Sequence, residues 1–194
     1  MKQALIVIVV IVVIALLVGG MYVSRRNQMV TLNEQVKSNW AQVDVVLQRR
    51  SDLIPNLVET VKGFAAHETT VYDDIAKARA ALGGAQTPKD KIAANAQLDG
   101  ALSRLLVIVE NYPQLRSNQN FLQLQDELAG TENRISVERK RYDDAIQAYN
   151  TFIGLFPNNI FAGWAGYKRN DAYFAAPEAS RAVPKVQFPA PASQ

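Results

Sequence analysis

The stretch Arg49-Arg50-Ser51-Asp52-Leu53-Ile54-Pro55-Asn56-Leu57-Val58 combines a helix stop, a helix cap and a proline in one short run. Proline lacks a backbone N–H, and its ring clashes with the carbonyl group four residues earlier, here that of Ser51. We therefore predict that one helix ends near Arg50 and that a second begins with Ser51 or Asp52 as its N-cap. Pro55 would then lie in the first turn, where proline is tolerated. The stretch predicts the corner of a helical hairpin.

The composition of the whole chain narrows the possible classes of protein. A length of 194 residues suits one compact domain on a membrane anchor. The chain has no cysteine, which excludes disulfides, thiol nucleophiles, thiolate metal sites and a lipid-modified N-terminal cysteine. The net charge is only +3, and its basic residues alternate with acids along helical stretches. We therefore expect no nucleic-acid partner.

The N-terminal segment is apolar and contains no charge from residue 4 to residue 23. As a helix this run is ~30 Å long, which matches the hydrocarbon core of a bilayer. We predict a transmembrane anchor with a basic flank over residues 1–26, inserted in the lipid bilayer through residues 4–23. The alternative is a cleavable signal peptide with Val18 and Gly20 at the cleavage site, although its apolar core is usually only ~7–15 residues long.

The residues beyond the anchor show helical periodicity in four segments, and sustained alternation typical of strands is missing. No proline or diglycine interrupts residues 21–50, so the first segment should extend the spanning helix into one rod of about 70 Å, unless Gly19-Gly20 bends it. The predicted fold is all-α: an antiparallel up-down bundle of four long helices over residues 27–157. The apolar positions that carry this prediction are Met29, Val36, Trp40, Val43 and Leu47; Leu57, Val61, Phe64, Val71, Ile75, Ala78 and Leu82; Ile92, Leu98, Leu102, Leu105, Leu106, Val109 and Tyr112; and Phe121, Leu128, Ile135, Tyr142, Tyr149 and Phe156.

The boundaries of the later helices have their own signals. Thr87 or Pro88 should open the third helix, and Pro113 should end it or begin the next corner. The fourth helix should run from near Ser117 to Phe156. A short helix and an extended strap over residues 158–188 should complete the same domain, and residues 189–194 should be disordered. The aromatic residues of this end would either cover a groove of the bundle or form an exposed patch for a partner or a membrane surface; they include Phe161, Trp164, Tyr167 and Phe174.

Several blocks of sequence together resemble the LemA family of bacterial membrane proteins. They are the opening stretch extended to Glu68, then Tyr112-Pro113-Gln114-Leu115, Thr131-Glu132-Asn133-Arg134-Ile135, Tyr149-Asn150 and Phe156-Pro157-Asn158-Asn159-Ile160. The resemblance implies an all-helical domain at a bacterial membrane, with no assigned cofactor and no established reaction. One departure is Asp143, where the family pattern has Asn after the tyrosine.

The membrane side of the domain stays open. Arg25 and Arg26 follow the span, whereas Lys2 and the terminal amine precede it, and this balance favours a cytoplasmic domain on a single-pass plasma membrane protein. Some LemA-like proteins are lipoproteins or carry their positive charges before the span, which implies the opposite side.

A polar cluster is predicted from the helix seams. Arg50 continues the seam of the first helix and Glu132 lies on the seam of the fourth, so antiparallel packing should bring them together. A buried pair of this kind would fix the helix register. The alternative is a site for an anionic ligand or a partner, built on Arg49 and Arg134. The full candidate cluster is Arg49, Arg50, Glu132, Arg134 and Arg139.

Catalytic, cofactor-binding and metal-binding residues are not assigned. His67 is the sole histidine, and the zinc-protease helix motif needs a second one at position 71, which is valine. Gly83-Gly84 lacks the spacing of a phosphate-binding loop and is typical of a helix end. The pairs Asp73-Asp74 and Asp143-Asp144 are neighbours in helices, where side chains diverge by about 100°.

These observations favour a non-enzymatic, membrane-anchored helical scaffold or adaptor in the organisation of the bacterial envelope. Its expected partners are membrane proteins or further copies of itself, and no small-molecule substrate or cofactor is expected. One alternative is a module that senses lipid or the membrane surface through Arg25, Arg26 and the terminal aromatics. The other is an enzyme that uses carboxylates and His67.

Overall fold

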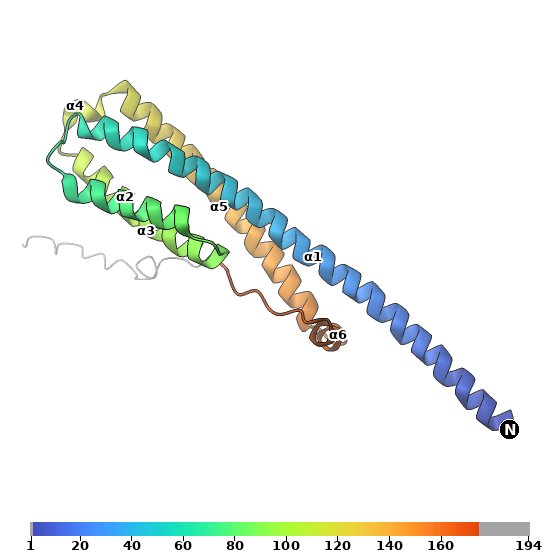
Figure 1. Cartoon of the computed structure of the whole chain (residues 1–194). Coiled ribbons are helices and arrows are strands. Elements are labelled where there is room, and N and C mark those ends of the chain that lie inside the picture. The colour runs from blue at the N-terminus through green and yellow to red at the C-terminus, as the bar shows by residue number, and fades with distance from the viewer. Residues whose placement is uncertain (1, 175–194) are drawn as a thin grey trace, which may run out of the picture.

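The computed structural model describes residues 2–174 and is all-α (Figure 1). The predicted disordered tail of residues 189–194, and residues 175–188 of the predicted strap, lie outside the described residues. The helices are α1 (Lys2–Lys62), α2 (Thr69–Gly84), α3 (Pro88–Val109), α4 (Pro113–Arg116), α5 (Gln119–Gly154) and α6 (Asn158–Ala165).

Helix α1 is a single helix of 61 residues that joins the apolar segment to the bundle. The predicted rod is therefore confirmed, and Gly19-Gly20 does not interrupt it. The side chains of residues 4–20 are all exposed, as expected of a segment that could insert in a membrane. Helix α3 is also long and apolar enough to cross a membrane, but 39% of its most apolar window is buried, in keeping with a core helix.

The predicted corner at Arg50 is wrong. Ser51 is buried in the interior of α1, Pro55 lies within the same helix, and the chain turns only after Lys62. The carbonyl of Ser51, which loses its helical partner at Pro55, instead accepts a hydrogen bond of 3.1 Å from Nε of Arg79 in α2. A side chain distant in sequence thus satisfies the group that should have ended the helix.

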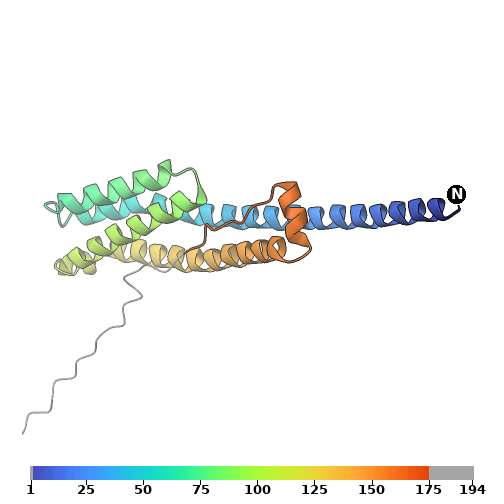
Figure 2. The same ribbon diagram turned by 90° about the horizontal axis from the view of Figure 1, so that it is seen from below.

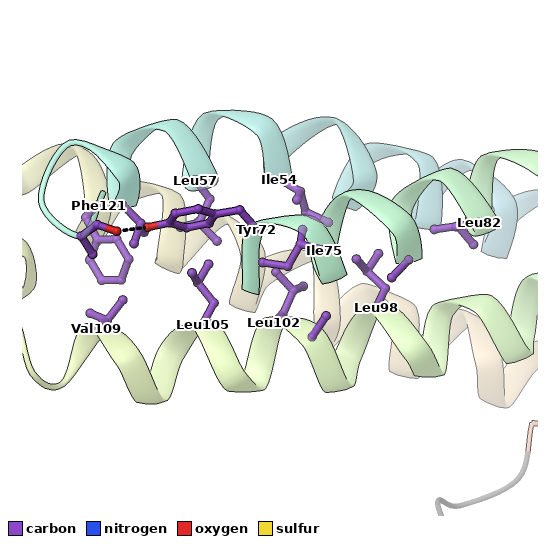
Figure 3. Packing of buried hydrophobic residues seen from close by; sticks show 14 of the residues in the cluster. Ile54, Leu57, Tyr72, Ile75, Leu82, Leu98, Leu102, Leu105, Val109 and Phe121 are labelled. Carbon is purple, nitrogen blue, oxygen red and sulfur yellow. Dashed lines mark hydrogen bonds between the residues drawn. The ribbon is translucent and has the colours of Figure 1, made fainter. Parts of the chain in front are cut away.

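The true corner lies between α1 and α2, at residues 63–68. The apolar repeat continues across it because both helices face the same core, so the pattern alone does not reveal the break. Phe64, assigned to the predicted second helix, is exposed in the turn. The hydroxyl of Tyr72 donates a hydrogen bond of 2.7 Å to the carbonyl of Ala65 and ties the turn to α2 (Figure 3).

The remaining helix boundaries agree with the sequence to within a few residues. Thr87 is the N-cap of α3, and its hydroxyl accepts a hydrogen bond of 3.2 Å from the backbone N–H of Asp90. Pro113 opens the single turn α4. Asn118 caps α5 through a bond of 3.1 Å from the N–H of Phe121, and α5 ends at Gly154.

The helices run alternately away from and back towards the N-terminal end, so the antiparallel up-down packing is confirmed (Figure 1). Helix α5 packs antiparallel along α1, and α2 and α3 form a hairpin against the distal half of this pair (Figure 1). All four long helices meet only in this distal half. Nearer the N-terminus, the α1–α5 pair is completed by α6 and by the strap of residues 167–174 (Figure 2).

The buried apolar side chains form two separate cores along the rod. The distal core lies among α1, α2, α3, α4 and the start of α5 (Figure 3). The proximal core lies among α1, α5 and α6. The largest fully buried members are Ile54, Leu57, Ile75, Leu98, Leu105, Leu115 and Phe121 in the distal core, and Met29, Leu47, Ile135, Tyr142 and Ile146 in the proximal one.

The chain turns back after α6 at a glycine. Gly166 has a φ of 75°, the left-handed conformation that glycine adopts without a Cβ penalty. The N–H of Tyr167 donates a hydrogen bond of 2.9 Å to the carbonyl of Ala162, which closes the helix end. The strap then runs back along the bundle, where Tyr173 and Phe174 pack on the proximal core.

Candidate functional site

Arg50 lies at the junction of the two cores. It occupies the heptad position of α1 that Met29, Val36, Val43 and Leu57 fill with apolar side chains. Its apolar neighbours on the seam are Leu47, in the proximal core, and Ile54, in the distal one. A charge at this position interrupts the apolar seam and separates the two cores.

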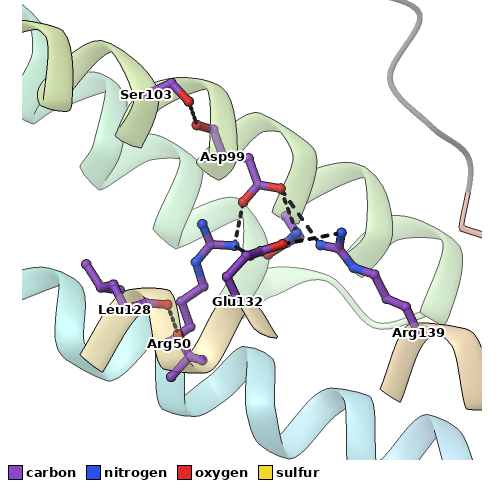
Figure 4. A network of polar contacts seen from close by, with 8 residues as sticks. Arg50, Asp99, Ser103, Leu128, Glu132 and Arg139 are labelled. Carbon is purple, nitrogen blue, oxygen red and sulfur yellow. Dashed lines mark hydrogen bonds and ion pairs between the residues drawn. The ribbon is translucent and has the colours of Figure 1, made fainter. Parts of the chain in front are cut away.

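The guanidinium of Arg50 binds carboxylates from two other helices (Figure 4). Its Nη1 is 2.8 Å from Oε2 of Glu132 in α5 and 2.5 Å from Oδ1 of Asp99 in α3. Arg139 approaches the same two acids, at 3.7 Å from Oε1 of Glu132 and 3.8 Å from Oδ2 of Asp99. Two cations and two anions from α1, α3 and α5 thus form one neutral network.

Burial within the network is unequal. The side chain of Arg50 is 10% exposed, whereas those of Asp99 and Glu132 are 37% and 42% exposed. The acids can therefore be solvated without Arg50, but Arg50 depends on the acids, because an unpaired buried charge is costly. The buried Nε of Arg50 has no hydrogen-bond partner within residues 2–174.

The structure brings together three of the five residues of the predicted cluster. Arg50, Glu132 and Arg139 meet as the antiparallel pairing of the seams predicts. Arg49 and Arg134 are exposed, and neither forms an ion pair with another described residue. Their role as a ligand or partner site stays a prediction.

Asp99 is the member of the network that the sequence interpretation missed. The feature of the sequence that could have indicated Asp99 is its position four residues after Asn95. Asn95 is a buried polar residue of α3. The Nδ2 of Asn95 donates a hydrogen bond of 3.1 Å to Oδ2 of Asp99 and so orients the carboxylate. Two polar residues one turn apart beside Leu98 indicate a polar layer next to the apolar, buried face of α3.

A groove lies between α3 and α5 next to the network, since these two helices have few close backbone contacts. A cavity of about 220 Å³ begins at Arg50 and Glu132, and a hollow of about 460 Å³ continues it towards α4. Leu106 and Gln125 line both. The remaining walls of the first cavity are apolar and comprise Leu57, Leu102, Leu128 and Ala129.

The strap connects to the network through Arg139. The guanidinium carbon of Arg139 lies 5.0 Å from the centre of the Phe174 ring. That ring also packs edge-on to Tyr142 at 6.1 Å and stacks with Trp40 at 6.4 Å between centroids. Of the predicted terminal aromatics, Phe161 is buried and Tyr167 and Phe174 are half-buried on the proximal core, whereas Trp164 is exposed.

Polar groups of α5 hold the strap backbone. The buried side chain of Asn150 donates from Nδ2 to the carbonyl of Asn170 at 2.7 Å, and its Oδ1 accepts from the N–H of Asn170 at 2.9 Å. Oδ1 of Asp143 accepts a bond of 3.1 Å from the N–H of Phe174. Burial raises the pKa of the Asp143 carboxyl, and the nearby Asp144 raises it further, whereas the Phe174 bond and Arg139 oppose the shift.

The residues considered for other chemistry are dispersed. Among the described residues, no group of three or more His, Asp or Glu side chains could hold a metal ion. His67 is exposed in the turn between α1 and α2. In the two acidic pairs, Asp74 binds Arg104 at 2.8 Å and Asp144 binds Lys140 at 2.6 Å.

Comparison with known proteins connects this architecture to a family. The profile of the LemA family matches residues 39–188. The magnetosome proteins MamQ 1 and MamQ 2 of Paramagnetospirillum magneticum are each 27% identical over 179 residues, which cover 79% of this chain and 66% of the relative. Protein LemA of Metamycoplasma hominis is 22% identical over 143 residues, with coverages of 73% and 65%. The chain thus spans less than two thirds of the length of these relatives.

Proposed function

The chain belongs to the LemA family, and we propose that it is a non-enzymatic, membrane-anchored scaffold or adaptor at the bacterial plasma membrane. The observation that carries this proposal is the continuity of α1 from the apolar segment into the bundle. A helix of this length extends about 90 Å. Because α5 packs along the part of α1 that follows the apolar segment, the bundle is joined through continuous helix to the segment that would span the membrane.

The groove between α3 and α5 is the surface that suits a partner. We assign to it one occupant, an amphipathic helix of another protein in the same membrane, because leucines line a groove between two helices. Polar side chains at its edges would set the orientation of that helix. These are Arg116 and Glu110 at one end and Glu132 at the other.

The relatives support this proposal in general terms. MamQ is named as a magnetosome protein, and its sequence is similar to that of this chain. A common fold does not transfer a specific role. The proposal therefore concerns the assembly of proteins at a membrane.

Photo-cross-linking in native membranes tests the groove. A photoreactive amino acid at Gln125, which lines both hollows, should yield a discrete adduct, whereas the same group at the exposed Val45 of α1 should not. An adduct of twice the mass of the chain would identify a second copy as the occupant instead. Identical adduct patterns at both positions would contradict a specific groove.

Substitution within the groove gives an independent test. Leu106→Glu and Leu122→Glu place charge on exposed leucines of the two hollows and should abolish the adduct of a probe at Gln125. Val107→Glu is the matched control, because Val107 is also exposed and lies outside both hollows. If Val107→Glu abolishes the adduct equally, the groove is not the docking surface.

The partner site on Arg49 and Arg134 is tested separately. Both side chains are exposed, so Arg49→Gln and Arg134→Gln should leave folding unchanged. Loss of a cross-linked partner in these variants would support a basic docking site. The enzyme alternative is tested by elemental analysis for bound metal and by comparing His67→Ala with the wild type on generic hydrolase substrates.

A further inference from the structure

Large apolar side chains remain exposed at one end of the bundle. Phe156, in the corner between α5 and α6, is 80% exposed, and Trp164 on α6 is 70% exposed. Leu155, next to Phe156, and Ile160, one helical turn before Trp164, are also exposed. Helix α6 is thus two-sided: Phe161 is buried in the proximal core, whereas Trp164 packs edge-on against the Phe161 ring at 5.8 Å between centroids and leaves most of its own surface exposed. We call residues Leu155, Phe156, Ile160 and Trp164 the proximal patch.

The position of the patch along α1 is set by an aromatic contact. The ring of Phe161 lies 5.8 Å from the ring of Tyr22, centroid to centroid. Tyr22 is the penultimate residue of the uncharged apolar run of residues 4–23. Helix α6 therefore crosses α1 at the level where this run ends, and of the described chain only α1 continues beyond it (Figure 2).

We propose that the proximal patch is a second membrane contact, inserted in the interfacial layer of the same bilayer that α1 spans. This inference rests on the proposed anchoring of α1. At the level of Tyr22 the chain meets the boundary between hydrocarbon and headgroups, where tryptophan and other aromatic side chains are favoured. A short amphipathic helix that lies across the membrane normal presents its apolar face to this layer.

The charges around the patch fit a layer of anionic headgroups. Residues 155–168 contain Lys168 and no acidic residue, whereas the next basic residue, Arg169, forms an ion pair of 3.5 Å with Asp171. Arg25 and Arg26 follow the apolar run of α1 at the same end. Basic side chains next to an inserted apolar face add electrostatic attraction to lipid phosphates.

A second contact would determine how the bundle is held. A single spanning helix leaves the rod free to tilt and rotate. With α6 in the interface, α1 and α6 touch the bilayer at two points that are locked together by Phe161 and Tyr22. The groove between α3 and α5 would then face a constant direction relative to the membrane.

Tryptophan fluorescence of the full chain in vesicles provides the test, because Trp40 and Trp164 are the two tryptophans of the sequence. Trp40→Phe leaves Trp164 as the sole emitter. The vesicles contain phosphatidylethanolamine and phosphatidylglycerol, with or without a lipid brominated in the upper acyl chain. Brominated lipid should remove most of the Trp164 emission, and iodide in the water should have little effect.

Trp164→Phe is the matched control, since its remaining Trp40 packs against Tyr142 and Phe174 well away from Tyr22 along α1. Its emission should be insensitive to brominated lipid. If Trp40→Phe does not fold, the difference between wild type and Trp164→Phe gives the same information.

The outcomes separate this inference from the proposed anchor. If the chain floats with the vesicles but Trp164 is quenched by iodide and not by bromine, the patch faces water and the inference is wrong. If Trp164 is shielded from both quenchers, and more so at high protein-to-lipid ratio, the patch is a contact between copies and the inference is again wrong. A chain that does not float contradicts the anchor itself, and the inference with it.

Discussion

Nε of Arg79 donates a hydrogen bond of 3.1 Å to the carbonyl oxygen of Ser51. In an uninterrupted α-helix, this carbonyl would accept a bond from the N–H of residue 55, which is proline and has none. Because Ser51 is buried, its carbonyl cannot rely on water. The arginine of α2 replaces the missing donor and allows α1 to continue for two more turns.

Loss of this donor should destabilise the bundle. We expect Arg79→Ala to lower the free energy of unfolding by about 1 kcal/mol, measured by urea denaturation of the full chain in detergent micelles. In a Pro55→Ala background, the new N–H of residue 55 can donate a hydrogen bond to the carbonyl of Ser51. Arg79→Ala should then lower the free energy of unfolding by clearly less. Lys77→Ala, on the exposed side of α2, is the control. If Arg79→Ala lowers the free energy of unfolding equally in both backgrounds, Arg79 does not stabilise the bundle through its hydrogen bond to Ser51.

The two acids that bind Arg50 should be able to substitute for one another. We expect Glu132→Gln or Asp99→Asn alone to cost about 1 kcal/mol, because the remaining carboxylate still pairs with Arg50. The double variant leaves a buried cation unpaired and should cost roughly 3–5 kcal/mol. Asp126→Asn, exposed on α5, should have little effect. Additive costs in a double-mutant cycle would exclude a shared role.

Asn150 should control the attachment of the strap. Asn150→Ala removes both hydrogen bonds to the backbone of Asn170 and leaves these peptide groups without their partner. We expect cleavage by trypsin after Lys168 and Arg169 to become roughly tenfold faster, because local opening becomes easier. Gln147→Ala, exposed on the same helix, should keep the wild-type rate. Equal rates in both variants would mean that aromatic packing alone holds the strap.

Asp143 should make stability depend on pH. Its raised pKa means that the ionised carboxylate is less favourable in the folded than in the unfolded chain. This cost is complete at neutral pH and disappears as pH falls below the ordinary pKa of aspartate. Asp143→Asn keeps an oxygen acceptor for the N–H of Phe174 and should stabilise the protein at pH 7 by less than about 1 kcal/mol.

The gain should shrink as pH is lowered through the raised pKa, because the wild-type carboxyl then becomes neutral as well. Thermal unfolding followed by circular dichroism at neutral and acidic pH measures this difference. A gain that is constant with pH would indicate that the ionisation of Asp143 does not contribute.

The register of the main helix pair was predictable from the sequence. Heptad spacing in both helices places Arg50 and Glu132 on facing seams, and antiparallel packing brings such positions together. Asp99 was not predictable in the same way. Its helix packs mainly on α2, and its approach to Arg50 depends on how the α2–α3 hairpin is placed on the α1–α5 pair. The periodicity of apolar residues within α3 does not show where the α2–α3 hairpin lies on the α1–α5 pair.

The sequence by itself determined the apolar N-terminal helix, the all-α class and the starts of α3 and α5, because these depend on hydrophobicity, period and caps within a few neighbouring residues. Only the tertiary structure decided that α1 passes through Pro55, because the substitute donor comes from Arg79 on another helix. It also decided that Trp164 is exposed while Phe161, on the same short helix, is buried against Tyr22. The local sequence shows which backbone and side-chain groups need a hydrogen-bond partner or an apolar contact. Which residue provides that partner or contact depends on how segments distant in the sequence pack together.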